Sequence, residues 1–165
     1  MVLSTVRLNE LIVAGMNKAR LLSPATYNTM NLQYKTGIRL SEVDVSRWEL
    51  LGNGNYYLNT KKYNHPREFK GDEVPEIWKR AIENGDVSSY ITNHSTYERR
   101  LRLVFGKYKF VVGKKRLVSH LFRHNWAKRK KEELGTNEAV REVLGEKRLS
   151  SAISYIASDI IYTEY

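Results

Sequence analysis

The sequence predicts a mainly α-helical chain of the α+β class with one small antiparallel β-sheet, and three observations support this. Apolar residues recur at nearly helical spacing over residues 5–20. Serine, threonine, proline and glycine stand at positions where helices are expected to begin and end. Finally, Gly52-Asn-Gly-Asn55 is a strong turn signal between two short segments, residues 48–51 and 56–60, which suit paired strands.

Capping signals place the other helices along the chain. Ser23 followed by Pro24 predicts the start of a second helix that runs to Leu32, and Lys35-Thr-Gly37 breaks it. A short third helix is expected to display Arg39 and Glu42 on one side, because they lie three residues apart. Further helices are expected from Pro75 to Asn84, over residues 96–105, from Ser119 to Leu134, from Thr136 to Leu144, and from Ser150 onward.

A second turn is expected over residues 61–66, followed by a short strand near residues 67–69. The segment from Trp48 to Phe69 therefore predicts the small antiparallel sheet, with lysines at the tip of a hairpin.

Length and composition predict one domain covering residues 1–165. The chain has no cysteine, which excludes a disulfide scaffold and a thiolate zinc site. No apolar run approaches the ~20 residues of a membrane span, and the first residues do not read as a secretory signal. We therefore expect a cytoplasmic protein without a membrane partner.

The positive charge of the chain is concentrated in one stretch. The net charge is +10, and residues 99–131 hold 13 of the 28 basic side chains and no acidic one. Aromatic residues are interleaved with the basic ones, so this stretch is expected to be folded. It predicts a surface that contacts the phosphate backbone of nucleic acid, and the candidate DNA-binding residues are Lys107, Lys109, Lys114, Lys115, Arg116 and Lys128. A solvated basic face with no partner is the alternative interpretation.

Two arginines and a histidine have the chemistry needed to act on a phosphodiester. Attack on this group requires positive charge against its non-bridging oxygens, and the planar guanidinium of arginine supplies two parallel hydrogen bonds. Arg39 and Arg123 are the candidates. His120 lies three residues before Arg123, so a helix presents both toward one site, where the histidine could accept a proton or bind phosphate. On the same helix, His124 is expected to point about 100° away from Arg123.

A lysine and a tyrosine complete the set. A lysine near a hairpin tip could protonate the departing 5′-oxygen, and Lys61 is the first candidate and Lys62 the second. Either lysine could instead be a simple phosphate contact. Tyr155 is the candidate nucleophile, because tyrosine can form a covalent phosphodiester that conserves bond energy.

In this order, the residues resemble the catalytic domain of the tyrosine recombinases, the phage integrase family. Thr36-Gly-Ile-Arg-Leu-Ser-Glu42 resembles the first arginine box of that family. His120-Leu-Phe-Arg-His-Asn-Trp-Ala127 resembles the second box, and Leu144-Gly-Glu-Lys-Arg-Leu-Ser-Ser-Ala-Ile-Ser-Tyr155 resembles the segment that ends in the nucleophile. With the lysine after Thr60, the resemblance covers roughly residues 5 to 160.

The resemblance implies a helical catalytic domain that cleaves and rejoins DNA through a 3′-phosphotyrosyl bond. Tyr155 would attack, Arg39 and Arg123 would hold the phosphate, His120 would assist proton transfer, and Lys61 would protonate the leaving oxygen. Glu42 would orient its neighbours. No metal or nucleotide cofactor is implied. The implied partners are double-stranded DNA and further copies of the chain, as a tetramer on DNA, and the source would be a virus or another mobile element.

The chain departs from the family pattern at the position nine residues before the tyrosine. Family members usually have histidine or tryptophan there, and this chain has Glu146. Because a carboxylate beside a phosphate is electrostatically unfavourable, either Glu146 turns away or Lys147 or His124 fills the role.

The two ends of the domain raise further expectations. The helical core-binding domain that precedes the catalytic domain in the family is expected to be absent from this chain. The tail after Tyr155 could dock on a neighbouring protomer or pack on its own domain.

Four alternatives to a site-specific recombinase remain. A hairpin telomere resolvase and a type IB topoisomerase-like enzyme would use the same catalytic set. A DNA-binding module that has lost activity would keep the basic surface, and Glu146 is the residue that favours it. An RNA-binding protein would explain only the basic stretch.

Overall fold

The computed structural model describes residues 1–60, 65–106 and 108–164, with the side chain of residue 164 left out. Within these ranges the helices are α1 (Thr5–Leu22), α2 (Pro24–Thr36), α3 (Glu76–Asn84), α4 (His94–Phe105), α5 (His120–Leu134), α6 (Asn137–Leu144) and α7 (Leu149–Ala157). The strands are β1 (Trp48–Leu50), β2 (Tyr56–Leu58), β3 (Arg67–Phe69), β4 (Tyr108–Val112), β5 (Lys115–Leu117) and β6 (Ile161–Glu164). Three 3-10 turns are η1 (Leu40–Glu42), η2 (Val45–Arg47) and η3 (Gly71–Glu73).

The longer predicted helices are confirmed, and local capping explains several of their boundaries. The hydroxyl of Ser23 accepts a hydrogen bond from the Thr26 amide, and Pro24 occupies the first turn of α2. Thr136 caps α6 in the same way, by accepting from the amide of Ala139 at 3.2 Å. Gly37 ends α2 with φ 68°, a left-handed conformation that a residue without Cβ adopts at little cost.

Two local predictions were wrong. Ser119 precedes α5 as expected, but its hydroxyl donates to the carboxylate of Glu98 instead of capping the helix. The short helix expected to carry Arg39 and Glu42 is a single 3-10 turn, η1, with Arg39 in an extended conformation just before it. The carboxylate of Glu42 folds back and accepts from the Arg39 amide at 2.8 Å, which closes this turn.

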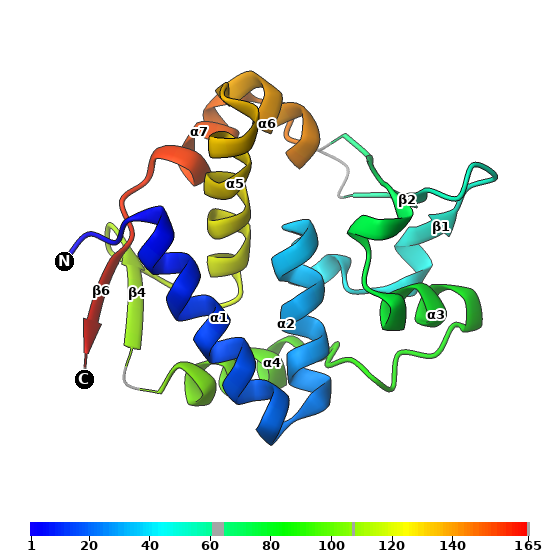
Figure 1. Cartoon of the computed structure of the whole chain (residues 1–165), viewed down its shortest axis with the longest axis horizontal. Helices are drawn as coiled ribbons and strands as arrows, with labels where there is room; N and C mark the ends of the chain where they lie inside the picture. The colour runs from blue at the N-terminus through cyan, green and yellow to red at the C-terminus, as the bar shows by residue number, and fades with distance from the viewer. Residues whose placement is uncertain (61–64, 107, 165) are drawn as a thin grey trace.

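The predicted small sheet is confirmed as β1-β2-β3, antiparallel throughout. Its core face is aromatic: the Trp48 ring stacks on Phe69 with centroids 5.5 Å apart and meets Trp78 of α3 edge-on at 5.9 Å. This sheet and α3 form one end of the molecule (Figure 1).

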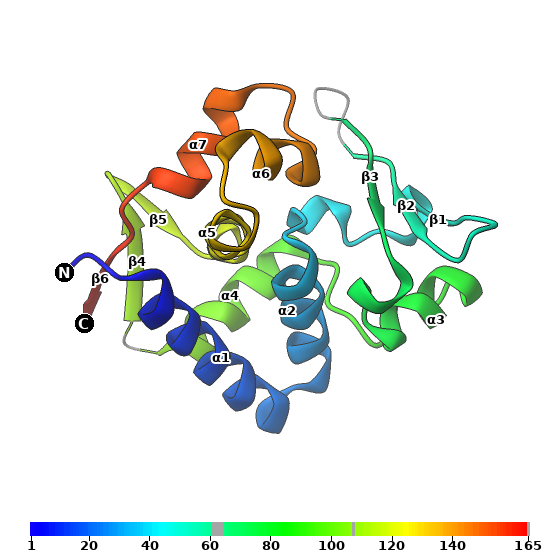
Figure 2. The same ribbon diagram turned by 45° about the horizontal axis from the view of Figure 1, so that its top comes forward.

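A second antiparallel sheet, β5-β4-β6, lies at the opposite end and was not predicted (Figures 1 and 2). A tight turn at Gly113, with φ 60°, joins β4 to β5. The C-terminal strand β6 pairs with β4, and the isolated bridge between Val2 and Ile161 adds the N-terminal segment. The tail therefore packs on its own chain in this structure, which is one of the two arrangements that the sequence left open.

Helix α5 runs through the middle of the fold and packs against α1, α2, α6 and α7 (Figure 2). The side chains of Leu121 and Phe122 are fully buried in the core, as are Ile12 and Leu32 from α1 and α2. No helix in the described part of the chain is long and apolar enough to cross a membrane.

Candidate active site

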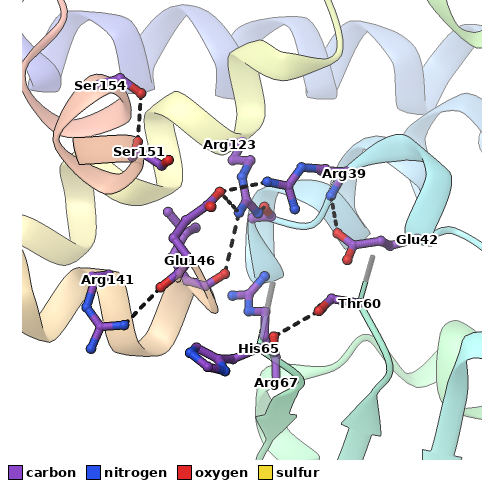
Figure 3. A network of polar contacts seen from close by, with 12 residues as sticks. Arg39, Glu42, Thr60, His65, Arg67, Arg123, Arg141, Glu146, Ser151 and Ser154 are labelled. Atoms are coloured by element: carbon purple, nitrogen blue, oxygen red, sulfur yellow. Dashed lines mark hydrogen bonds and ion pairs between the residues drawn. The ribbon is translucent and has the colours of Figure 1, made fainter. Parts of the chain in front are cut away.

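The two candidate arginines meet at one carboxylate. Arg39 precedes η1, Arg123 lies in the first turn of α5, and Glu146 lies in the loop between α6 and α7. The Oε1 atom of Glu146 accepts from Nη2 of Arg39 at 2.6 Å and from Nη2 of Arg123 at 2.8 Å. Figure 3 shows both guanidinium groups pointing toward this carboxylate from different elements. The predicted convergence of positions 39 and 123 is therefore present, with an anion of the protein between them.

The guanidinium of Arg123 is held rigidly. Its side chain is 1% exposed, and its Nη1 donates to the Gly37 carbonyl at 2.8 Å, while Nη2 also reaches the Leu144 carbonyl at 3.4 Å. The Arg39 side chain is 16% exposed and lies nearer the surface. Arg123 thus forms the buried, fixed side of the site, and Arg39 forms the side nearer the surface.

Glu42 contacts Arg39 through the backbone. Besides accepting from the Arg39 amide, the fully buried Glu42 accepts from the indole of Trp48 at its carbonyl oxygen, at 2.8 Å. These contacts tie the Arg39 turn to the first sheet.

Arg67 is an important residue that the sequence interpretation missed. From strand β3, its Nε donates to the Val143 carbonyl at 2.9 Å and its Nη2 donates to the Thr36 carbonyl at 2.6 Å. Burial lowers the pKa of Arg67 to about 9, and nearby Arg123 adds to this shift, yet the group stays charged at pH 7. The available signal was strand alternation, because Arg67 shares the core face with Phe69. Arg67 joins the ends of α2 and α6, next to the two-arginine site.

Lys61 and Lys62 lie outside the described residues. The described residues on either side of them meet, since the Thr60 hydroxyl donates to the His65 carbonyl at 2.8 Å. The His65 amide in turn donates to the Gly145 carbonyl at 2.7 Å, one residue before Glu146. The described ends of the β2–β3 connection, Thr60 and His65, therefore lie beside the candidate site (Figure 3).

Tyr155, on α7, lies against the inner arginine. The guanidinium carbon of Arg123 is 5.1 Å from the centre of the Tyr155 ring, and the His124 ring meets Tyr155 edge-on with centroids 4.9 Å apart. The three positions 39, 123 and 155 therefore gather in one region. The His124 ring thus also contacts Tyr155. From its position on the helix, His124 was expected only to point about 100° away from Arg123.

Lys128 has an internal role in place of the predicted DNA contact. Its ammonium group donates to the carbonyls of Ile156 and Ser158 at 2.9 and 2.7 Å, at the end of α7. Burial lowers its pKa. Lys128 thus fixes the helix that carries Tyr155, and its donors face the protein and not a phosphate backbone.

Two histidines share a cavity of about 550 Å³ with Tyr155. Lys115 and Ser158 also line it, and the Nδ1 atom of His124 lies 3.2 Å from the Ser158 hydroxyl. Partial burial lowers the pKa of His120, and the positive charge of Lys115 adds to the effect. Burial lowers the pKa of His124 to about 4, again with help from a nearby lysine. Both imidazoles are therefore neutral at pH 7 and able to accept a proton.

The buried His124 predicts a loss of stability in acid. Its folded-state pKa of about 4 lies below the unfolded value of about 6.5, so the unfolded chain binds the extra proton between these values. Stability from this group is complete above pH 6.5 and falls as the pH drops toward 4, by roughly 2 to 3 kcal/mol near pH 4.5. Urea unfolding at pH 7 and pH 4.5 should show a smaller pH effect in His124→Gln than in the parent. The exposed His94→Gln replacement is the control, and an unchanged pH effect in His124→Gln would contradict the prediction.

The remaining candidate DNA contacts lie mainly on the second sheet. Lys109 is on β4, Lys114 is in the exposed turn, and Lys115 and Arg116 are on β5. Lys107 lies outside the described residues, and Lys147 is exposed beside Glu146. The described part of the basic stretch is thus folded, as predicted.

No protein-family model and no curated protein sequence matches this chain. Solved structures do match. The XerA recombinase superposes with a TM-score of 0.64 at 16% identity over 95% of this chain and 60% of its own. A lambda integrase(75–356) dimer bound to a COC′ core site gives 0.64 at 15% identity over 93% of this chain and 58% of its own. This chain has the fold of the tyrosine-recombinase catalytic domain.

A third structure with the tyrosine-recombinase fold extends the comparison. The XerH site-specific recombinase, bound to palindromic difH substrate in a post-cleavage complex, matches with a TM-score of 0.60 at 15% identity over 89% of this chain and 48% of its own. This chain spans between about half and three fifths of the length of these proteins. The expected fold is therefore confirmed.

Proposed function

We propose that residues 1–165 form the catalytic domain of a site-specific DNA recombinase or integrase, which cuts and rejoins DNA through a 3′-phosphotyrosyl intermediate. The observation that carries the proposal is the meeting of Arg39 and Arg123 at one carboxylate oxygen, with the Tyr155 ring over Arg123. A fold shared with site-specific recombinases supports it.

The proposed step is an in-line displacement at phosphorus. Two guanidinium groups bind the non-bridging oxygens, where negative charge is redistributed in the transition state. The Tyr155 hydroxyl loses its proton as its oxygen bonds to phosphorus, and the bond to the 5′-oxygen breaks. Rejoining is the reverse, with the 5′-hydroxyl as nucleophile and tyrosine as leaving group.

Proton transfer is assigned to groups around the tyrosine and on the β2–β3 connection. His120 and His124 line the cavity that contains Tyr155, and both are neutral at pH 7, so either can accept the phenolic proton. Lys61, or Lys62 in its place, would protonate the 5′-oxygen, on the strength of its sequence position next to the anchored Thr60 and His65.

Double-stranded DNA is the proposed partner, contacted along β4 and β5 by Lys109, Lys114, Lys115 and Arg116. Assembly of several copies on DNA, as a tetramer, belongs to the same proposal. A DNA-binding module without activity is the second candidate, because Glu146 occupies the space between the two arginines.

Covalent capture tests the function directly. The chain is incubated with a labelled library of nicked duplexes, whose cleavage releases a short strand and traps the enzyme on DNA. We expect a protein–DNA adduct that survives denaturing electrophoresis, with the linkage at Tyr155 by mass spectrometry. Tyr155→Phe should form none, while Tyr162→Phe, which removes a hydroxyl from β6, should react like the parent. DNA binding without any adduct from the parent chain would favour the inactive module.

A further inference from the structure

Glu146 is buried at the centre of the candidate site, and its backbone is fixed. The residue is 5% exposed. Its carbonyl accepts from Nη1 of Arg141 at 2.9 Å, and its amide donates to the Arg141 carbonyl at 3.2 Å. The preceding Gly145 has φ 78°, a conformation that turns the chain sharply out of α6. The fold therefore directs this carboxylate toward Arg39 and Arg123.

The contacts of the carboxylate are those that a phosphate would make. A carboxylate is a planar anion with two acceptor oxygens, and guanidinium groups bind it and phosphate by the same charged hydrogen bonds. Arg123 also donates to the backbone carbonyls of Gly37 and Leu144, so its position does not depend on the Glu146 side chain alone. Its Nε atom is buried without a hydrogen-bond partner among the described residues, so donor capacity remains after Glu146 is bound.

A second anion cannot share this space favourably. Two unit negative charges within about 4 Å repel each other, and the repulsion grows where water is excluded. DNA can therefore bind the two arginines only if the Glu146 carboxylate leaves them.

We propose that Glu146 is an internal stand-in for the scissile phosphate, which neutralises Arg39 and Arg123 until DNA displaces its carboxylate. This inference rests on the proposed function and adds a regulatory step to the same site. Without the stand-in, Arg123 would lie buried beside the equally buried Arg67 with less opposing charge. Glu146 is thus stabilising in the free protein and inhibitory toward phosphate.

Binding of inorganic phosphate tests the inference without any need for catalysis. We expect Glu146→Gln, which keeps the shape of the side chain and removes its charge, to bind phosphate at least about tenfold more tightly than the parent in NMR titrations. Glu142→Gln removes the same charge from an exposed residue of α6 and should leave the affinity unchanged. Adding Arg39→Ala to Glu146→Gln should abolish the gain. Equal affinities in the parent, Glu146→Gln and Glu142→Gln would overturn the proposal.

A second variant covers the case in which Glu146→Gln does not fold. Glu146→Asp keeps the charge and shortens the side chain, so its carboxylate should hold the arginines less well and phosphate affinity should rise. An affinity no higher than that of the parent would count against the stand-in.

Adduct formation separates this inference from the proposed function. If both hold, Glu146→Gln forms the covalent DNA adduct faster than the parent in a single turnover. Tighter phosphate binding with no adduct from any variant would uphold the stand-in and overturn the recombinase proposal. An active parent, an inactive Glu146→Gln and unchanged phosphate binding would instead make Glu146 part of the catalytic assembly and overturn the stand-in.

Discussion

Arg123→Met is expected to lower the free energy of unfolding by about 3 to 5 kcal/mol, a large part of the stability of a domain of this size. Methionine fills much of the space but offers no donor. The replacement leaves the buried Glu146 carboxylate with one arginine fewer and removes a donor from the Gly37 carbonyl. Urea unfolding of the parent and the variant measures the loss. Adduct formation should disappear under conditions where the variant is still folded.

A double variant and a surface control show whether burial causes this loss. Arg123→Met with Glu146→Gln removes both charges, so it should be more stable than Arg123→Met alone, because no buried carboxylate is left with only Arg39 to oppose its charge. Arg7→Met makes the same chemical change at an arginine whose side chain is 51% exposed and paired with Glu10, and should cost less than about 1 kcal/mol. If Arg123→Met lowered the free energy of unfolding no more than Arg7→Met does, the buried contacts of the Arg123 guanidinium would not stabilise the site.

The helices could be predicted because their boundaries depend on local chemistry. Ser23 with Pro24, and Thr136, satisfy amides within one turn of themselves, so a window of a few residues holds the signal. The second sheet depends on pairing between β4 and β6, which lie about fifty residues apart in the sequence. Its strands are short, and basic residues interrupt the apolar pattern of β4 and β5, so no local signal marked them.

The sequence indicated several residues of the candidate site but not the contacts between them. The order of Arg39, Arg123 and Tyr155 indicated the site, and the structure gathers these side chains. The sequence could not show that Glu146 bridges both arginines, because this depends on how the α6–α7 loop meets α5. The inward direction of Lys128 was hidden for the same reason, since its partners are carbonyls at the end of α7.

Gly145→Ala is expected to destabilise the chain and to weaken the site at the same time. Gly145 has φ 78°, where a side chain costs about 1 kcal/mol, and an added Cβ would lie 2.7 Å from the His65 carbonyl oxygen and 2.9 Å from Cγ of Arg67. Relief of this clash requires β3 to move away from α6, which threatens the hydrogen bond from the His65 amide to the Gly145 carbonyl. The crowding around the added Cβ should lower the free energy of unfolding by a further 1 to 3 kcal/mol, roughly.

Gly135→Ala separates the two parts of this effect. Gly135 also ends a helix in the left-handed region, with φ 87°, but nothing lies within 4 Å of an added Cβ. Gly135→Ala should lower the free energy of unfolding by only about 1 kcal/mol, the penalty for a side chain in the left-handed conformation, and leave adduct formation unchanged. Gly145→Ala should be clearly less stable than Gly135→Ala in thermal unfolding. It should also form adduct more slowly even when folded, because Glu146 directly follows Gly145 and the His65 amide donates to the Gly145 carbonyl. Equal stability and equal adduct rates in the two variants would show that the close approach of His65 and Arg67 to Gly145 does not hold the site together.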